Sequence, residues 1–239
     1  MKIVSYTELR FVRHAEATHM ESIGIAAGRS EGAELTNAGM HQAYQLGMTW
    51  RAEAYHPDVT YTSPIRRARQ TLDLARKAAG LTGIAWRTNQ DMAEQCLGAH
   101  EGKLRSKVYT DHTQQLIEQL GADYTHPGKN SEGKHGESLM DVSSRMVGFL
   151  SLKAAGLQKR GYGETAAIVS HSTAIRSMLC RLDLTGLHEK PDPHQLQRNF
   201  LDYPAIGPCS QTVIILETTP SGEVHHRIEE VGRPLEDEL

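Results

Sequence analysis

Histidine, serine and arginine gather in three short segments of this chain: Arg13-His14, Ser63 with Arg66 and Arg67, and Ser170-His171. Guanidinium groups bind phosphate through paired hydrogen bonds. A neutral imidazole, whose ordinary pKa is about 6.5, is a competent nucleophile near pH 7. Taken singly, each segment is as readily explained by a structural histidine, a helix cap or a solvated helix face. Brought together, they would suit the binding and transfer of a phosphoryl group.

The elements that must position these segments alternate between strands and helices. We expect strands at 8–13, 59–63, 84–87, 165–170, 211–217 and 224–231, and helices at 36–54, from Ser63 onward, at 138–157 and at 172–184. Thr36 and Ser63 are expected as N-caps, with Pro64 in the first helical position, and Ser138 with Asp141 resembles a capping box. The alternation predicts an α/β fold, a three-layer α/β/α sandwich around a mostly parallel sheet. Ligands of such sheets bind beyond the carboxyl ends of the strands, where the three segments lie.

The composition is that of an ordinary globular protein. The 239 residues suit a single domain, 1–239, with a polar insertion at about 103–136 placed over the active site. The formal net charge of -3 argues against a general nucleic-acid or anionic-membrane binder. The chain contains no apolar stretch near the ~20 residues that a membrane span needs. We therefore expect no nucleic-acid partner, no membrane association and a cytoplasmic location.

Cysteine and histidine usage gives little indication of a metal site. The three cysteines are widely spaced and form no C-x-x-C pair. The 13 histidines include no H-E-x-x-H or comparable ligand spacing. We predict that the protein uses no catalytic metal.

The order of six motifs carries more information than any one of them. The motifs are F-V-R-H-A-E at 11–16, L-T-x-x-G-x-x-Q-A at 35–43, S-P-I-R-R-A-R-Q-T at 63–71, E-Q-C-L-G-A-H-E-G at 94–102, G-E-S-L-x-D-x-x-x-R at 136–145 and V-S-H-S-x-x-I-R at 169–176. In this order and spacing the chain resembles the histidine phosphatase (phosphoglycerate-mutase-like) superfamily, over about residues 8–217. The resemblance implies the same α/β fold and a phosphohistidine intermediate.

The resemblance also implies a catalytic set. His14 matches the nucleophile, Arg13 and Arg67 match the phosphate-binding arginines, and His171 matches the second histidine of the pocket. Glu94 matches the acid that protonates the leaving oxygen, and it could later take a proton from the attacking water. The chemistry implied in this way requires no metal and no cofactor.

Substrate contacts are expected from Arg29, Ser172 and Thr18. Ser172 replaces the usual glycine of S-H-G, and we expect it to cap the following helix, with a contact to phosphate as the alternative. Ala15 replaces the usual glycine of R-H-G, which would cause strain only if that position needs a positive φ. The segment 103–136 is expected to set substrate choice.

Departures from the mutase branch favour a phosphatase. Where mutases place a serine and a Trp-Asn pair, this chain reads Ala17-Thr18-His19-Met20, and Glu94 is not followed by the Arg and Tyr of mutases. A phosphoglycerate-type mutase remains the alternative, as does a non-catalytic phosphate-binding module on the same scaffold. The expected partner is a small phosphorylated substrate, with a phosphoprotein and a homodimer left open.

Overall fold

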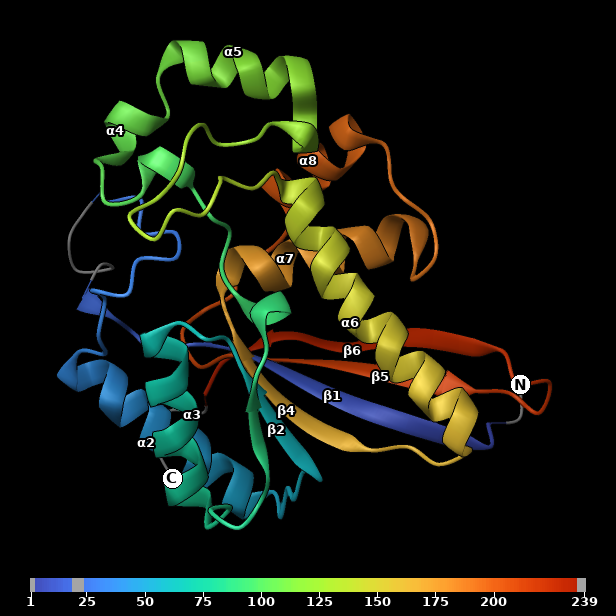
Figure 1. Cartoon of the computed structure of the whole chain (residues 1–239). Helices are drawn as coiled ribbons and strands as arrows, with labels where there is room; N and C mark the ends of the chain where they lie inside the picture. Colours follow the sequence, from blue (N-terminus) through green and yellow to red (C-terminus); the bar gives the residue numbers. More distant parts are fainter. Residues whose placement is uncertain (1–2, 19–23, 236–239) are drawn as a thin grey trace.

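The computed structural model describes residues 3–18 and 24–235, and its centre is a six-stranded sheet (Figure 1). The strands are β1 (Ser5–Arg13), β2 (Val59–Thr62), β3 (Trp86–Thr88), β4 (Thr165–Ser170), β5 (Gln211–Thr218) and β6 (Val224–Arg233), in the order β3-β2-β4-β1-β5-β6. Strands β3, β2, β4 and β1 are parallel, β5 is antiparallel to β1, and β6 is antiparallel to β5. The predicted mostly parallel sheet is confirmed.

Helices cover both faces of this sheet. Helices α2 (Asn37–Ala52) and α3 (Arg66–Ala79) lie on one side, and α6 (Leu139–Arg160) and α7 (Ser172–Thr185) lie on the other (Figure 1). Side chains alternate between the faces along a strand, so Leu9 and Phe11 of β1 pack with α6 and α7 while Val12 packs with α2 and α3. The predicted three-layer sandwich is confirmed, with a separate apolar core on each face.

Two of the expected helix starts form as predicted. The Thr36 side chain accepts a hydrogen bond from Gly39 N at 2.9 Å, and the Ser138–Asp141 capping box is complete. Gly39 is the glycine of the 35–43 motif, and a Cβ there would lie 1.9 Å from Glu16 O. That position therefore admits only glycine without a shift of the backbone.

The third start differs from the prediction. Helix α3 begins at Arg66 with Ile65 as its N-cap, so Ser63 is not the capping residue and Pro64 is not in the first helical position. Ser63 N donates to Val169 O at 2.9 Å and so continues the pairing with β4 beyond the end of β2. The chain is still extended there, and the helix can begin only after it has left the sheet. The Ser63 side chain accepts from Ile65 N at 3.2 Å and also has a distant partner, described below.

Three short helices at the carboxyl end of the sheet were not predicted from the sequence. They are α4 (Arg105–Val108) and α5 (Asp111–Leu120) within the segment 103–136, and α8 (Pro193–Asp202). Three 3₁₀ turns accompany them: Gln90–Met92, Gly98–His100 and Gly121–Asp123. Figure 1 shows α4 and α5 beyond the layers that cover the sheet, while α8 packs against α6 and α7. Strand β3, expected at 84–87, lies at Trp86–Thr88.

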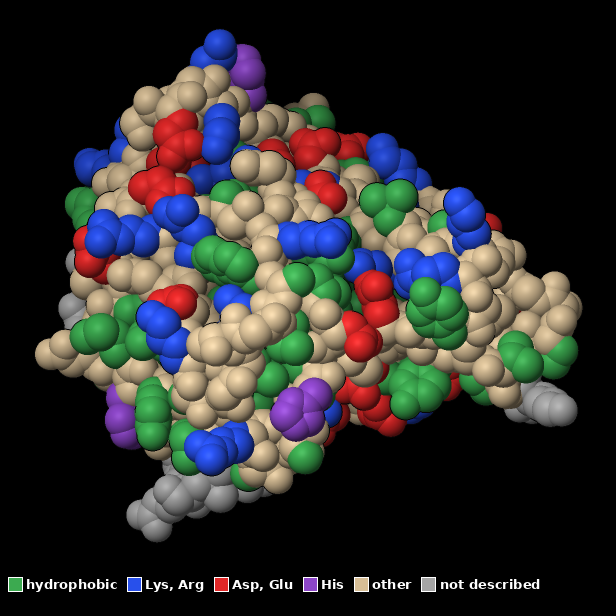
Figure 2. Space-filling model, turned by 60° about the horizontal axis from the view of Figure 1, so that its bottom comes forward, with side chains coloured by type: hydrophobic (Ala, Val, Ile, Leu, Met, Phe, Trp, Pro, Cys, Tyr) green, Lys and Arg blue, Asp and Glu red, His purple; other side chains and the backbone are tan. Residues whose placement is uncertain are grey.

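The surface carries both signs of charge side by side. On the face in Figure 2, Lys and Arg are interspersed with Asp and Glu, and apolar side chains are scattered between them. Within the described parts of the chain, no helix is both long enough and apolar enough to cross a bilayer.

Candidate active site

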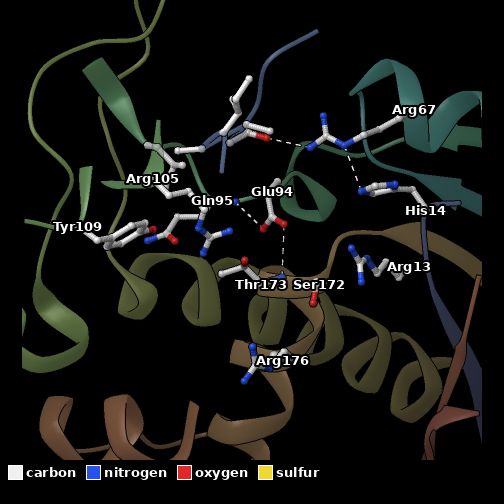
Figure 3. Close-up of a pocket in the computed structure, with 15 residues that line it drawn as sticks. Arg13, His14, Arg67, Glu94, Gln95, Arg105, Tyr109, Ser172, Thr173 and Arg176 are labelled. Carbon is white, nitrogen blue, oxygen red and sulfur yellow. Dashed lines mark hydrogen bonds between the residues drawn. The ribbon is translucent and has the colours of Figure 1, made fainter. Parts of the chain in front are cut away.

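A cavity of about 280 Å³ opens where β1 and β4 end (Figure 3). Its wall includes Arg13, His14, Arg67, Glu94 and Ser172. Arg13 ends β1, Arg67 lies in the first turn of α3 and Ser172 begins α7. The sheet therefore brings together residues from four of the sequence motifs, as the rule for parallel sheets predicted.

Both ring nitrogens of His14 have partners, the backbone on one side and the Arg67 side chain on the other. Its amide donates to Ser170 O at 2.9 Å, which extends the β1–β4 ladder, and its side chain is 3% exposed. Nδ1 lies 2.7 Å from Ala15 O, a pure acceptor, so Nδ1 carries the proton. Arg67 Nε donates to Nε2 at 3.1 Å, so Nε2 presents a lone pair. This is the neutral tautomer that a nucleophilic imidazole needs.

Arg67 lies at the centre of the polar network. It is 1% exposed, and besides His14 it donates to Gly28 O at 2.8 Å and Ser30 O at 3.1 Å. Burial lowers the pKa of Arg67 to about 10. The guanidinium is therefore still charged at neutral pH and is fixed by carbonyl groups that no phosphate would displace.

His171 faces the same arginine from the end of β4. Its Nδ1 lies 3.3 Å from Arg67 Nη2, a pure donor, so its Nε2 carries the proton and donates to Ser63 Oγ at 2.8 Å. The rings of His14 and His171 are 5.0 Å apart, edge to face. The Ser63 hydroxyl thus orients the second histidine, whereas from the sequence Ser63 was expected to cap a helix.

Arg13 and Glu94 complete the catalytic set predicted from the sequence. Arg13 Nη1 donates to Ile206 O, and burial lowers the pKa of Arg13, an effect that the nearby Glu94 opposes. Glu94 accepts from Gln95 N at 2.9 Å through one oxygen and from Thr173 N at 3.4 Å through the other. Thr173 N belongs to the first turn of α7, where unpaired amides favour an anion.

Arg29 binds the backbone carbonyl of Glu94. Its Nε donates to Glu94 O at 2.8 Å and its Nη2 to Glu137 at 2.7 Å, while Arg145 Nη2 reaches the same Glu94 carbonyl at 3.2 Å. The guanidinium of Arg29 is thereby committed within the protein, and Arg29 is not among the residues that line the cavity. A substrate contact by Arg29 stays a prediction, which this geometry does not favour.

The two departures from glycine have simple structural consequences. Ser172 lines the cavity as the first residue of α7, and the N-cap is His171, so the expected capping role of Ser172 is wrong. Ala15 is fully buried in the core below α2 and α3. Among the described non-glycine residues only Ala54 and Cys209 have positive φ, so Ala15 is unstrained.

Thr18 lies at the edge of the described structure. Its side chain is exposed, its amide donates to Glu34 O at 2.9 Å, and it is not among the cavity-lining residues. A substrate contact by Thr18 stays a prediction. His19 and Met20, part of the comparison with mutases, fall outside the described residues.

Among the cavity residues that were given no individual role from the sequence are Arg105, Tyr109 and Arg176. Arg176 donates to Phe200 O and to Tyr203 O at 2.8 Å and stacks over the Phe200 ring at 4.3 Å. Its spacing of four from Ser172 was a usable signal, because residues four apart share one face of a helix. Together with Arg13 and Arg67, these arginines outnumber Glu94 and make the cavity attractive to anions.

Possible metal ligands are not clustered in the part of the chain that is described. Over residues 3–18 and 24–235, no group of three or more His, Cys, Asp or Glu side chains is arranged to hold a metal ion.

The relatives of this chain include both phosphoglycerate mutases and phosphatases. A 2,3-bisphosphoglycerate-dependent phosphoglycerate mutase of Nitrobacter winogradskyi is 28% identical over 165 residues, which cover 68% of this chain and 72% of the mutase. Phosphoserine phosphatase 1 of Hydrogenobacter thermophilus is 30% identical over 178 residues, covering 73% of this chain and 75% of the phosphatase.

The fold is shared with solved structures at lower identity. A mycobacterial glucosyl-3-phosphoglycerate phosphatase superposes with a TM-score of 0.72 at 18% identity, over 95% of this chain and 99% of that one. The sequence model of the histidine phosphatase superfamily (branch 1) matches residues 9–200. With the six motifs, the three-layer fold and this match in agreement, the chain belongs to the histidine phosphatase superfamily.

Proposed function

We propose that this protein hydrolyses phosphomonoesters through a phosphohistidine intermediate on His14. One observation carries the proposal: Arg67 Nε donates to His14 Nε2 at 3.1 Å while Nδ1 is held by Ala15 O at 2.7 Å. The ring is therefore oriented with its lone pair toward a fixed cation. An incoming phosphoryl oxygen would take over that N–H from Nε2, which places phosphorus beside the nucleophile.

In the first step His14 Nε2 attacks phosphorus and the bond from phosphorus to the ester oxygen breaks. Arg13 and Arg67 stabilise the charge that spreads over the equatorial oxygens, and His171 positions Arg67 by accepting from its Nη2. Protonated Glu94 gives its proton to the departing alkoxide, so an alcohol leaves and the glutamate becomes a carboxylate. The amides of Gln95 and Thr173 already bind its two oxygens and stabilise that carboxylate.

In the second step water replaces the alcohol. Glu94 takes a proton from water as its oxygen attacks phosphorus, the bond from phosphorus to His14 breaks, and inorganic phosphate leaves. The neutral histidine and the glutamic acid are restored. Glu94 therefore gives a proton in the first step and takes one in the second, so no second base is required.

Phosphoenzyme trapping tests this mechanism. A rapid quench with ³²P-labelled substrate should yield an acid-labile, base-stable phosphoenzyme in the native protein. His14→Ala should abolish both the label and turnover. His41→Ala, at an exposed position of α2, is the matched control and should keep both. Full activity in the His14 variant would end the proposal.

We also propose that the reaction needs no metal, because the residues that line the cavity supply the charge stabilisation and the proton on their own. Activity should survive exhaustive treatment with EDTA, and vanadate should inhibit by adopting the five-coordinate geometry of the transferring phosphoryl group. Loss of activity that Zn²⁺ or Mg²⁺ restores would contradict metal independence.

A phosphoglycerate-type mutase is the second candidate, and similarity to the Nitrobacter mutase is the observation that favours it. The fate of the phosphoryl group separates the two. Labelled phosphoenzyme mixed with unlabelled 3-phosphoglycerate should release inorganic phosphate if the protein is a phosphatase and should label the acceptor if it is a mutase. A non-catalytic module would form no phosphoenzyme at all.

A further inference from the structure

The catalytic cavity shares a wall with a second, larger one. This second cavity measures about 440 Å³, against about 280 Å³ for the first. Gln95, Arg105 and Tyr109 line both. In Figure 3, Arg105 and Tyr109 lie on the side of Glu94 opposite His14 and Arg67, so the second cavity continues the line from nucleophile to acid.

The lining of the second cavity is of a different kind. Apolar and aromatic side chains dominate it: Ile117 of α5, Phe200 and Leu201 of α8, Leu139 at the start of α6, and Tyr124, which follows the 3₁₀ turn Gly121–Asp123. Ligand pockets typically measure roughly 300–1,000 Å³ and combine such a lining with a few polar groups. The second cavity has these properties, whereas the first is small and cationic.

The histidine in this lining is neutral under ordinary conditions. His126 is 4% exposed, and burial lowers its pKa to about 4. Its Nδ1 lies 3.1 Å from His100 Nδ1, which burial also keeps toward the neutral form by lowering its pKa. An apolar group can therefore pack beside His126 at neutral pH without burying a charge.

Geometry fixes which part of a substrate would reach this space. The phosphoryl group must sit at His14 between Arg13 and Arg67, and the ester oxygen must face Glu94. The remainder of the alcohol then leads past Gln95 toward Tyr109. A short alcohol would therefore end within the first cavity, while a longer one would extend into the second.

We propose that the preferred substrate is a phosphomonoester whose alcohol carries an aromatic or extended apolar group, and that this group occupies the second cavity. The proposal rests on the phosphatase function proposed above. It assigns α5 and α8, which the sequence did not predict, the task of choosing the substrate.

The test compares esters that differ only in the distal group. Butyl phosphate and 4-phenylbutyl phosphate both release a primary alcohol, so they place the same demand on Glu94. We expect kcat/KM to be at least about tenfold higher for the phenylbutyl ester, since small apolar differences in a pocket are worth roughly 10–200-fold.

Two variants on one helix locate the effect. Gln197 lines the second cavity, and Gln195 is an exposed residue of the same helix α8 that does not line it. Gln197→Trp should fill the space and remove most of the tenfold preference, whereas Gln195→Trp should keep it. Ile117→Asn, which makes the opposite wall polar, provides a second variant in case the first fails to fold.

The outcomes separate this proposal from the one that it rests on. Equal kcat/KM values for the two esters, or equal losses for both in the Gln197 and Ile117 variants, would overturn the substrate proposal while leaving the phosphatase intact. If neither ester phosphorylates His14 in the native protein, the phosphatase function itself fails. A preference lost in the Gln197 variant and kept in the Gln195 variant would establish the second cavity as the binding site of the alcohol.

Discussion

Replacing Glu94 by glutamine isolates the proton that this residue is proposed to supply. The side chains have nearly the same shape, so the loop and the cavity should be preserved. A glutamine oxygen can accept from Gln95 N, where the glutamate bond is 2.9 Å long. Its NH₂ group must then face Thr173 N, where the present bond is a weak 3.4 Å.

The structure sets an upper limit on the indirect effect of this change. A hydrogen bond contributes about 1 kcal/mol net, which is a factor of about five in rate if it is lost entirely from the transition state. General acid catalysis typically contributes ~10²–10⁴-fold, and more with a poor leaving group. The rate decrease expected from losing the proton therefore exceeds the decrease expected from losing the hydrogen bond by more than an order of magnitude, and the two effects can be told apart.

The leaving group provides the measurement. An alkyl phosphate departs as a strongly basic alkoxide and needs the proton, whereas nitrophenyl phosphate departs as a weakly basic phenolate. Glu94→Gln should slow phosphorylation of His14 by at least about 100-fold with an alkyl phosphate and by no more than about fivefold with nitrophenyl phosphate. Pre-steady-state burst rates are required, because Glu94 also acts in the hydrolysis that follows.

Glu101→Gln is the matched control. Glu101 accepts from Arg29 N at 3.0 Å, Leu97 N at 3.2 Å and Asn130 Nδ2 at 3.1 Å, and it does not line the catalytic cavity. Any change in the phosphorylation rate of the Glu101→Gln variant should be the same for both leaving groups. If the Glu94 variant loses both substrates equally, or neither, Glu94 is not the general acid and another carboxylate must be sought.

Two further perturbations follow from the buried groups. Arg67→Lys should lower kcat/KM by roughly 10²–10³-fold, because a single ammonium cannot replace the donors that reach His14 and Gly28 O together; near-native steady-state kinetics would contradict this. Since the pKa of His126 is lowered to about 4 from an ordinary 6.5, the folded protein binds fewer protons than the unfolded chain between these values. The free energy of unfolding should therefore fall by roughly 3 kcal/mol as the pH drops through that window. Urea denaturation at several pH values should show a smaller fall in His126→Phe than in the native protein. Parallel pH profiles for the two proteins would refute the assignment.

Short-range patterns in the sequence were sufficient for most of the scaffold. Strand β4 lies at 165–170 as predicted, because a compact apolar run can be buried on both faces only in the middle of a sheet. The Thr36 and Ser138 caps also form as predicted, since a capping bond joins residues only three apart. The order of the motifs predicted a catalytic set, and the sheet brings three of its members, His14, Arg67 and His171, together.

Contacts between distant segments could not be predicted in this way. Ser63 meets His171, 108 positions along the chain, and this partner, rather than the local helix, determines the role of its hydroxyl. Arg29 looked like a substrate contact but is bound to Glu94 O and Glu137, which a linear motif does not reveal.

The helices that form the second cavity show the same limit. Helices α5 and α8 are only 10 residues each, so their propensity is weak and tertiary packing stabilises them. The sequence by itself determined the fold class, because local patterning encodes it, and motif order predicted the nucleophile and the residues that would bind phosphate. Only the tertiary structure decided which groups orient His171, which brace Glu94 and where a leaving alcohol could lie, because those depend on side chains that meet across the carboxyl edge of the sheet.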